Sequence, residues 1–471
     1  MIEHTSLYID GDWIPATGKH TAVINPFTEA VAGTFVAGTE LEVDAAVAAA
    51  RRALPAWAGL TPGERVDYLE AIANGIEERR SEFAEMISAE MGAPLKLAHR
   101  VHTGLPISIL RSHRDVLDDT RFDTEVANSR VVRQPFGVVA AITPWNYPLH
   151  QVIAKVAPAL TAGCTIVIKP SDEAPLSTYM LAEVIHAVGL PPGVINLVTG
   201  GRGVVGNALV GHPDIAMVSF TGSTTAGRAI ARVAADFLRP VTLELGGKSA
   251  NVVLDDADLA VAVKVGVANA FMNAGQTCTA WTRLVVPRSQ KGDAIELCRA
   301  HAEAYTVGDP RDATTRMGPV VSARQRASIV EHIVAAQSAG ATLVTGGADA
   351  VDGCDTGFFV RPTVFADVAP DSRLAQEEVF GPVLAVLDYE TEEEALAIAN
   401  NSRYGLSGSV WSADPDRATR FAMSMDTGQV DINGGTFNPL APFGGYKQSG
   451  LGREFGTYGV EEFLQIKSIQ F

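Results

Sequence analysis

Between residues 217 and 244 the chain reads Met217-Val-Ser-Phe220, then Thr221-Gly-Ser223 and finally Val241-Thr-Leu-Glu244. The first segment predicts a short apolar strand, and the Thr-Gly-Ser turn leads into a helix from about Thr225. The last segment predicts the next strand. A strand, a helix and a second strand in succession indicate a βαβ unit, whose two strands lie parallel in one sheet.

The same alternation of short apolar strands and helices continues on both sides of this unit. Further strands are expected at Val131–Ile142, Thr165–Lys169, Val194–Val198, Ala250–Leu254, Arg283–Val286, Thr342–Thr345 and Val383–Val386. We therefore expect an α/β protein with two Rossmann-like doubly wound domains. The second domain is expected to begin near Gly246-Gly247.

Two long helices are predicted ahead of these strands. Residues Glu40 to Trp57 are Ala-rich with helical spacing, and Pro55 is expected to interrupt the helix. Residues Pro62 to Glu90 predict a second long helix with one charged face.

The composition fits a large core and excludes one class of partner. A length of 471 residues exceeds the size at which a single core usually stops growing, and 47% of the residues are hydrophobic. The net charge is −17, from 37 basic and 54 acidic side chains, and no basic block reverses it locally. Such a chain repels phosphate backbones, so we expect no nucleic-acid binding.

Cysteine usage and the N-terminus indicate a cytoplasmic protein. Cys164, Cys278, Cys298 and Cys354 are too few and too scattered for a disulfide scaffold, and no His lies at metal-ligand spacing nearby. We expect reduced thiols and no metal site. The first ten residues lack the pattern of a signal peptide, and no apolar run is long enough to span a bilayer, so no membrane association is expected.

Three polar residues are candidates for catalysis. Cys278 follows Gly275-Gln-Thr277, Glu244 precedes Leu245-Gly-Gly247, and Asn146 lies between two prolines. A thiolate can attack an electrophilic carbon, a carboxylate can activate water, and an amide N–H can stabilise an oxyanion. Taken singly, each also has an ordinary interpretation: a buried small side chain, a capping or surface carboxylate, and an Asx turn.

Three segments are candidates for binding a nucleotide. Phe220-Thr-Gly-Ser223 opens a helix whose free N–H groups attract phosphate, although an ordinary Ser N-cap explains it equally well. Gly201-Arg-Gly-Val-Val-Gly206 matches G-x-G-x-x-G, but in a Gly-rich chain we interpret it as turn chemistry. Lys169-Pro-Ser-Asp172 ends a strand. Two interpretations are open: its Lys and Asp side chains hold ribose hydroxyls, or they form an exposed charge pair.

Seven segments together resemble those of one family. They are Pro144-Trp-Asn-Tyr147, Lys169-Pro-Ser171, Phe220-Thr-Gly-Ser223, Glu244-Leu-Gly-Gly-Lys248, Gly275-Gln-Thr-Cys278, Glu378-Val-Phe-Gly-Pro382 and Pro442-Phe-Gly-Gly-Tyr-Lys447. Their order and spacing resemble those of the NAD(P)-dependent aldehyde dehydrogenase superfamily, over essentially the whole chain. The resemblance favours the functional interpretation of each segment over its ordinary one.

The resemblance implies that an aldehyde is oxidised to a carboxylic acid. Cys278 would be the nucleophile that forms a thiohemiacetal. The Asn146 side chain and the Cys278 backbone N–H would form the oxyanion hole. Hydride transfer would leave a thioester on Cys278, which water activated by Glu244 would hydrolyse.

The resemblance also implies cofactor contacts. They are expected from Thr143, Pro144, Trp145, Lys169, Ser171, Asp172, Gly222, Ser223, Leu245, Glu378 and Phe380. Asp172 stands where many relatives have Glu. Either carboxylate accepts a hydrogen bond from a ribose 2′-OH and repels a 2′-phosphate, so NAD is expected as the cofactor, with NADP as the alternative.

The resemblance also implies a substrate pocket, whose residues are expected from their positions relative to these motifs. Its expected residues are Tyr147, His150, Gln151, Ala154, Met272, Thr279, Trp281, Thr436 and Phe437. Small-aldehyde relatives often carry a large aromatic residue where Ala154 stands, so we expect a roomier channel and a larger or aromatic aldehyde. No Arg occurs among these positions, which disfavours a substrate that carries a carboxylate.

The resemblance divides the chain into three parts. Residues 1–115 and 135–246 would form an NAD-binding domain, and residues 247–447 a catalytic domain. Residues 116–134 and 455–471 would form a small β oligomerisation arm that pairs with other subunits. A homotetramer or a homodimer is therefore expected.

Two other functions stay open. A CoA-acylating relative would pass the acyl group to coenzyme A, but such relatives generally lack a base at the position of Glu244. A non-catalytic structural or binding protein of the same fold would not need Cys278, Glu244 and Asn146 together.

Overall fold

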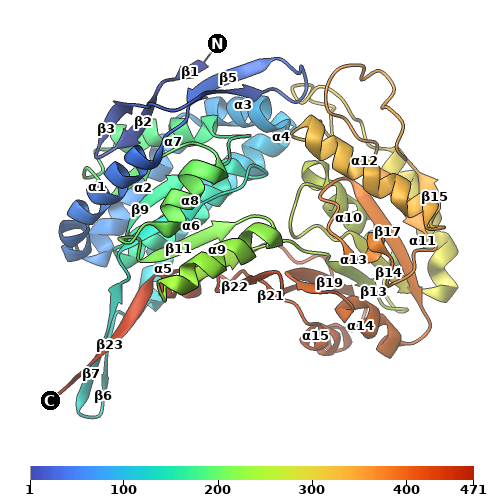
Figure 1. Cartoon of the computed structure of the whole chain (residues 1–471). Helices are drawn as coiled ribbons and strands as arrows, with labels where there is room; N and C mark the ends of the chain where they lie inside the picture. The colour runs from blue at the N-terminus through green and yellow to red at the C-terminus, as the bar shows by residue number, and fades with distance from the viewer. Residues whose placement is uncertain (1) are drawn as a thin grey trace.

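The computed structural model describes residues 2–471 and contains two large sheets, each flanked by helices (Figure 1). The first sheet has the strand order β22-β12-β11-β8-β9-β10-β2-β3. Its strands are β2 (Ser6–Ile9), β3 (Asp12–Pro15), β8 (Val138–Ile142), β9 (Thr165–Lys169), β10 (Ile195–Leu197), β11 (Met217–Thr221), β12 (Val241–Glu244) and β22 (Gly450–Leu451). Strands β8 to β12 are parallel. Strands β22 and β2 are antiparallel to their neighbours β12 and β10, and the edge strand β3 is antiparallel to β2.

The central strands of this sheet all end at one edge. The register pairs Ile142 with both Lys169 and Phe220, and it pairs Phe220 with Leu243. Strands β8, β9 and β11 are buried along their whole length, as expected for a parallel sheet with helices on both faces. The loops that follow these strands therefore emerge side by side.

Helices and helical turns surround this sheet. They are α1 (Glu40–Gly59), α2 (Pro62–Glu78), α3 (Arg80–Met91), α4 (Leu95–Leu97), the π-helical turn η1 (Ala98–Thr103), α5 (Gly104–Asp119), α6 (Pro148–Ala162), α7 (Leu176–Ala187), the π-helical turn η2 (Arg202–Gly206), α8 (Asn207–Gly211) and α9 (Thr224–Asp236). The G-x-G-x-x-G match falls on η2, between the short strand β10 and α8.

Two of the predicted helix boundaries are wrong. Pro55 does not interrupt α1, because buried side chains on both sides of it, including Val43 and Trp57, hold the helix against the core. The predicted helix 62–90 is two helices that meet at Arg79, whose backbone leaves the helical region (φ −105°, ψ 19°). The Arg79 guanidinium pairs with Glu183 of α7 at 2.9 Å, which fixes the break.

The second sheet has the strand order β15-β16-β17-β14-β13-β19-β20. Its strands are β13 (Ala250–Val253), β14 (Arg283–Pro287), β15 (Thr342–Thr345), β16 (Thr363–Ala366), β17 (Val383–Tyr389), β19 (Ser407–Trp411) and β20 (Gln429–Ile432). The helical elements around it are α10 (Leu259–Phe271), η3 (Met272–Gly275), η4 (Arg288–Gln290), α11 (Lys291–Glu303), α12 (Ala323–Ser338), α13 (Arg373–Gln376), α14 (Glu392–Asn400) and α15 (Pro415–Ser424).

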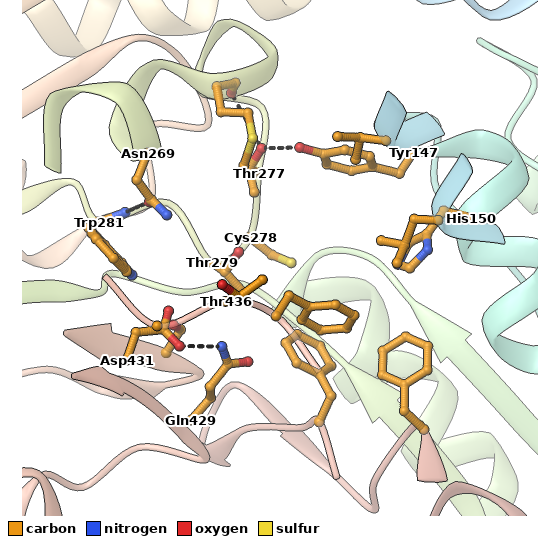
Figure 2. A pocket seen from close by; sticks show the side chains of 18 of the residues that line it. Tyr147, His150, Asn269, Thr277, Cys278, Thr279, Trp281, Gln429, Asp431 and Thr436 are labelled. Atoms are coloured by element: carbon orange, nitrogen blue, oxygen red, sulfur yellow. Dashed lines mark hydrogen bonds between the residues drawn. The ribbon is translucent and has the colours of Figure 1, made fainter. Parts of the chain in front are cut away.

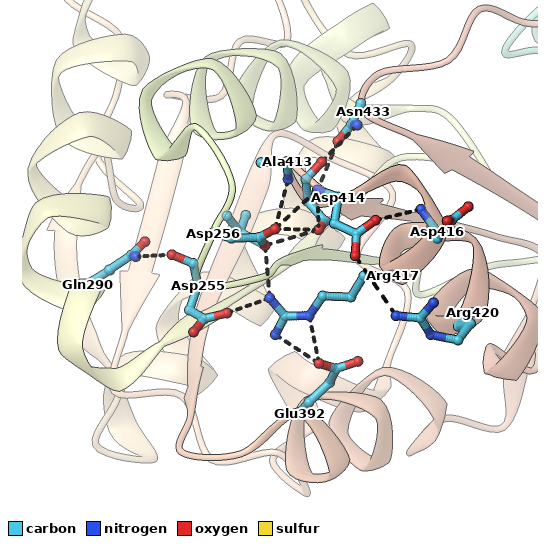
Figure 3. Close-up of polar contacts among 12 residues, drawn as sticks. Asp255, Asp256, Gln290, Glu392, Ala413, Asp414, Asp416, Arg417, Arg420 and Asn433 are labelled. Atoms are coloured by element: carbon cyan, nitrogen blue, oxygen red, sulfur yellow. Dashed lines mark hydrogen bonds and ion pairs between the residues drawn. The ribbon is translucent and has the colours of Figure 1, made fainter.

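An ion-pair network occupies the carboxyl edge of this second sheet (Figure 3). Arg417 of α15 pairs with Asp255 at 2.7 Å, with Asp256 at 3.0 Å and with Glu392 at 2.8 Å. Asp255 and Asp256 follow β13, and the Asp256 carboxylate also accepts a hydrogen bond from Ser412, directly after β19. Ligands of α/β sheets usually bind at the carboxyl edge. Here side-chain ion pairs and hydrogen bonds join the segments at that edge.

The remaining strands form small sheets. They are β1 (Ile2–His4), β4 (His20–Ile24) and β5 (Val31–Val36) in one sheet, β18 (Tyr404–Gly405) and β21 (Tyr446–Lys447) in another, and β6 (Asp123–Val126), β7 (Ser129–Pro135) and β23 (Leu464–Gln470) in a third. The third sheet projects from the body as an arm (Figure 1). The short helix α16 (Gly456–Glu461) precedes β23. Across residues 2–471, no helix has the length and apolar character needed to cross a membrane.

Candidate active site

The loop that carries Cys278 leaves α10 through a left-handed turn. Asn273 and Ala274 both have φ of 55°, and Gly275 has φ of 71°. A side chain at Gly275 would collide with the carbonyl oxygen of Gly381, so only glycine fits there. This turn ends helical pairing and places Cys278 in a half-buried position three residues later.

Three hydrogen bonds join this loop to the loop after β8. Asn146 Nδ2 donates to the Gln276 carbonyl at 3.0 Å, and Asn273 Nδ2 donates to the Asn146 carbonyl at 2.8 Å. The hydroxyls of Tyr147 and Thr277 share a hydrogen bond of 2.8 Å. The loops of Cys278 and Asn146 are therefore held in one hydrogen-bonded unit, although they lie far apart in the sequence. The second N–H of the Asn146 amide is left for an oxyanion.

Glu244 lies at the carboxyl end of β12, between β11 and β22, and is 4% exposed. Its Oε2 atom has no hydrogen-bond partner in the described part of the chain. Burial and the charge of Glu454 raise the pKa of Glu244 well above its usual range, against the effect of Lys155. Lys155 and Glu454 form a buried ion pair of 2.7 Å beside it. Glu244 is thus a carboxyl group whose proton affinity suits a general base.

Burial also raises the pKa of the Cys278 thiol, and the charges of Glu378 and Glu244 add to this effect. The thiol therefore keeps its proton until a nearby base accepts it.

Lys169 and Asp172 follow β9 at the same sheet edge. Burial lowers the pKa of Lys169, whose Nζ donates to the Pro170 carbonyl at 2.8 Å and lies 3.6 Å from Asp172 Oδ1. The Asp172 Oδ1 atom is buried and makes no hydrogen bond within residues 2–471. A cation and a carboxylate oriented in this way can donate to and accept from ribose hydroxyls.

The turn after β11 opens α9 toward the same edge. Ser223 caps this helix and accepts a hydrogen bond from Ala226 N at 3.3 Å, and Gly222 N donates to the Glu244 carbonyl at 2.9 Å. The buried hydroxyls of Thr221 and Thr224 have no partner among the described residues. Free donors at the start of a thirteen-residue helix fit a pyrophosphate.

Glu378 and Phe380 approach this edge from the second sheet. Glu378 Oε1 accepts a hydrogen bond from Gly247 N at 3.1 Å, and burial raises the pKa of Glu378 to about 7. A side chain at Gly246 would collide with the Glu378 carboxylate. Phe380 packs edge-on against Trp145, with ring centroids 5.5 Å apart.

The cofactor residues predicted from the sequence therefore come from neighbouring loops. Thr143, Pro144, Trp145, Lys169, Ser171, Asp172, Gly222, Ser223 and Leu245 follow β8, β9, β11 and β12, and Glu378 and Phe380 face them. Several buried polar atoms at this edge lack a protein partner in residues 2–471: Thr143 Oγ1, Asp172 Oδ1, Thr221 Oγ1 and Thr224 Oγ1. Such atoms fit a polar nucleotide, because buried polar groups are normally satisfied.

A cavity of about 580 Å³ opens in front of Cys278. Figure 2 shows Cys278 near its centre, with Tyr147 and His150 on one side and Trp281, Gln429 and Asp431 on the other. Of the residues predicted for the substrate pocket, those that line the cavity are Tyr147, His150, Gln151, Met272, Thr279, Trp281, Thr436 and Phe437.

Two expectations about this pocket are wrong. Ala154 is 1% exposed and packs in the core of the first sheet, so it does not line the cavity and says nothing about its width. Arg100, from the π-helical turn η1, does line the cavity, so a cationic side chain is present after all.

Sequence reasoning missed the other lining residues. They are Arg100, Val101, Leu105, Val265, Asn269, Thr277, Ser407, Gln429, Asp431, Gly434, Gly435, Phe443, Glu454 and Phe455. Most lie outside the seven motifs, in helices and strands whose local sequence indicates only structure. Thr277 and Phe443 are the exceptions, since they belong to the Gly275–Cys278 and Pro442–Lys447 motifs and were recognisable from them.

Comparison with known proteins decides the family. The model of the aldehyde dehydrogenase family matches residues 13–469. The chain belongs to this family. A 3-succinoylsemialdehyde-pyridine dehydrogenase of a Pseudomonas species is 45% identical over 471 residues, covering 100% of this chain and 99% of that protein. A geranial dehydrogenase of Castellaniella defragrans is 42% identical over 476 residues, covering 99% of each.

Solved aldehyde dehydrogenases superpose on the whole chain. A variant of aldehyde dehydrogenase C from Pseudomonas syringae, complexed with NAD+ and octanal, has a TM-score of 0.98 at 46% identity and covers 99% of this chain and 96% of that one. A Mycobacterium tuberculosis aldehyde dehydrogenase complexed with NAD+ has a TM-score of 0.97 at 42% identity, with 100% and 98% covered. The predicted family, α/β fold class and enzyme class, an NAD(P)-dependent aldehyde dehydrogenase, are confirmed.

Proposed function

We propose that this aldehyde dehydrogenase oxidises its substrate through Cys278, Asn146 and Glu244 and uses NAD. The observation that carries this assignment is the hydrogen-bonded unit of the Asn146 and Cys278 loops, which borders the cavity through Tyr147, Thr277 and Cys278. Only such fixed geometry lets a thiol attack and an amide donor act on the same carbonyl group.

The first step is attack on the aldehyde. Glu244 accepts the Cys278 proton, Sγ forms a bond to the carbonyl carbon, and the carbonyl electron pair moves onto oxygen. The Asn146 side chain and the Cys278 backbone N–H donate to that oxygen. The product is a thiohemiacetal on Cys278.

Oxidation and hydrolysis follow at the same carbon. NAD supplies the hydride acceptor when it is bound at the edge formed by Lys169, Asp172 and Glu378. Loss of the hydride leaves a thioester on Cys278. Glu244 first releases the Cys278 proton to solvent. It then accepts a proton from water, the new C–O bond forms, the C–S bond breaks, and the proton passes from Glu244 to the departing Cys278 thiolate as the carboxylic acid leaves.

The preference for NAD rests on Asp172. Its Oδ1 atom, which makes no hydrogen bond within residues 2–471, suits a 2′-OH, whereas a 2′-phosphate would meet like charge. The NAD+ complexes of the related structures from P. syringae and M. tuberculosis support this choice. We expect kcat/KM with NAD to exceed that with NADP by about tenfold or more, and Asp172→Asn to narrow the gap. A preference for NADP in the unaltered enzyme would contradict the assignment.

The substrate is proposed to be an aldehyde with a long apolar or aromatic body. The cavity is wide, and Tyr147, Trp281, Phe437, Phe443 and Phe455 line it. The relatives named for geranial and for a pyridine semialdehyde, and the one complexed with octanal, support a large substrate.

The decisive experiment is an aldehyde screen that follows NADH formation. It uses short, long-chain, aromatic and carboxylated aldehydes, with Cys278→Ala as the control. We expect turnover with the larger aldehydes and none in the variant. Residual dehydrogenase activity in Cys278→Ala would contradict the nucleophile assignment. Formation of acyl-CoA instead of free acid, when coenzyme A is added, would favour the acylating alternative.

Domain boundaries, assembly and compartment are part of the same proposal. We propose residues 1–115 and 135–246 as the NAD-binding domain, 247–447 as the catalytic domain, and 116–134 with 455–471 as an arm that makes a homotetramer or a homodimer. The free state of the cysteines supports a reducing compartment, the cytoplasm.

A further inference from the structure

One part of the cavity wall is polar, and the mechanism above does not use it. This polar corner consists of Trp281, Ser407, Gln429 and Asp431, all of which line the cavity. Ser407 and Gln429 are register partners at the start of the parallel strands β19 and β20. Figure 2 shows Trp281, Gln429 and Asp431 together on one side of Cys278. Most of the aromatic lining belongs to the other side.

Trp281 has a hydrogen-bond donor from which no group within residues 2–471 accepts. Its side chain is 3% exposed, and its Nε1–H has no acceptor in the described part of the chain. The backbone N of Trp281 donates to Asn269 Oδ1 at 2.8 Å, which fixes the residue. The buried Ser407 hydroxyl is likewise without a partner among residues 2–471. Buried donors are normally satisfied, so these two imply an acceptor that arrives from the cavity.

Asp431 brings an acceptor. Its carboxylate accepts a hydrogen bond from Gln429 Nε2 at 3.0 Å, and within the described chain no cation forms an ion pair with it. Burial raises its pKa above the usual range. Gln429 and Asp431 are two residues apart on β20, so their side chains point to the same face. A donor that arrives from the cavity would stabilise this partly buried carboxylate, which has no counter-ion among the described residues.

A single ligand group that both donates and accepts satisfies both requirements. We propose that the polar corner is a specificity subsite for a hydroxyl group on the body of the aldehyde. The hydroxyl donates to Asp431 and accepts from Trp281 Nε1–H. An ammonium group offers no acceptor to Trp281, and a carboxylate offers no donor to Asp431 and meets like charge. This inference rests on the proposed function and names a feature of its substrate.

The test compares matched aldehydes with and without a hydroxyl group. The pairs are hexanal with 6-hydroxyhexanal, and benzaldehyde with its 3- and 4-hydroxy derivatives. For at least one pair we expect kcat/KM to favour the hydroxylated aldehyde by about tenfold or more, since a buried site that hydrogen-bonds a hydroxyl rejects the analogue without it. Trp281→Phe, which removes the N–H and keeps an aromatic ring, should lower that ratio about fivefold or more.

Asp431→Ala should lower the same ratio, and Asp431→Asn, which keeps an acceptor, should restore part of it. The matched control is Trp411→Phe, because the Trp411 indole N–H donates to Asn251 Oδ1 at 2.8 Å outside the cavity. This control should leave the ratio unchanged. Comparing ratios between variants cancels the effect of the hydroxyl on the intrinsic reactivity of the aldehyde.

Three outcomes would overturn the subsite. One is a ratio near unity for every pair in the unaltered enzyme. Another is a ratio that Trp281→Phe and Trp411→Phe change equally. The third is a preference for 4-carboxybenzaldehyde over the hydroxylated compounds that persists in Asp431→Ala. Turnover of the unsubstituted aldehydes reports on the proposed function separately, so failure of the subsite and failure of the function are distinguishable.

Discussion

At the scale of single residues, the site holds two acids that must lose protons in turn. Burial raises the pKa of both Cys278 and Glu244, and the Glu244 charge further disfavours the Cys278 thiolate. In the proposed mechanism Glu244 serves as the base twice, first for the thiol and then for water, because it releases the first proton to solvent between the two steps.

Replacing Glu244 with Gln should separate these two steps. The amide keeps the size of the side chain but cannot accept a proton, so hydrolysis should slow and kcat should fall by about 10²–10⁴. The Cys278 thiol can still lose its proton to solvent, so the acyl group should accumulate on Cys278, which mass spectrometry of the intact protein detects after mixing with aldehyde and NAD. An unmodified Cys278 together with low kcat would show instead that the first step, and not hydrolysis, limits the variant.

The pH dependence follows from the same two groups. A raised pKa means that the protonated form persists to higher pH, so the fraction of active Glu244 carboxylate grows as the pH rises. We expect kcat to rise with pH, with its inflection well above the ordinary range of a carboxyl group. In Glu244→Gln this rise in kcat should vanish, while the rise in kcat/KM that reflects Cys278 should remain. An inflection near the usual glutamate range would show that Glu244 is not buried in the working enzyme.

The three candidates for catalysis could be named from the sequence, whereas many residues that line the cavity could not. Cys278, Glu244 and Asn146 stand in short segments whose neighbours serve the same chemistry, so the signal is local. Arg100 and Asp431 reach the cavity only because distant elements converge there. Nothing in their neighbouring residues distinguishes them from a solvated Arg on a helix and an Asp on a strand.

At the scale of elements, the decisive feature is the turn between α10 and Cys278. Asn273 and Ala274 continue a helical pattern in the sequence, yet both adopt the left-handed conformation. Tertiary contacts cause this: the Asn273 side chain donates to the Asn146 carbonyl, and Gln276 Oε1 accepts a hydrogen bond from Val321 N at 2.9 Å. Such contacts join residues far apart in the chain, so local propensity cannot predict them.

Gly275→Ala tests this turn. The added methyl group would collide with the Gly381 carbonyl, and φ of 71° is unfavourable for alanine, so the loop must shift. A displacement of about 1 Å at Cys278 should lower kcat by about 10²-fold. The matched control is Gly189→Ala, where φ is 67° and nothing lies within 4 Å of the added carbon. Equal kcat in both variants would show that the Cys278 position tolerates movement of this loop.

At the scale of the whole molecule, the two sheets contribute opposite edges to one site. The first sheet offers the carboxyl ends of β8, β9, β11 and β12, as expected for a nucleotide site. The second offers the amino ends of β19 and β20, since the Arg417 network occupies its carboxyl edge. The alternation of strands and helices predicted both sheets, but only the assembled structure shows which edges face each other.

The arm has an unpaired strand edge and exposed apolar side chains, which are suited to binding another chain. Strand β23 pairs with β7 along its whole length and leaves its other edge unpaired within residues 2–471. Ile466 is 68% exposed, Ile469 40% and Phe471 84%. An exposed strand edge with apolar side chains favours pairing with another chain. A second copy of this protein is the occupant that the proposed homo-oligomer supplies.

Charged residues on this strand should therefore change the assembly. We expect the unaltered protein to have the mass of a dimer or a tetramer by light scattering after size exclusion. Ile466→Lys combined with Ile469→Lys should shift it to a smaller species, because each lysine would have to be desolvated in the interface. The control, Gln465→Lys with Gln470→Lys, adds the same charge to the same strand at polar positions and should shift it less. A monomer mass for the unaltered protein would contradict the oligomer, and equal masses for the oligomeric protein and the isoleucine variant would place the interface elsewhere.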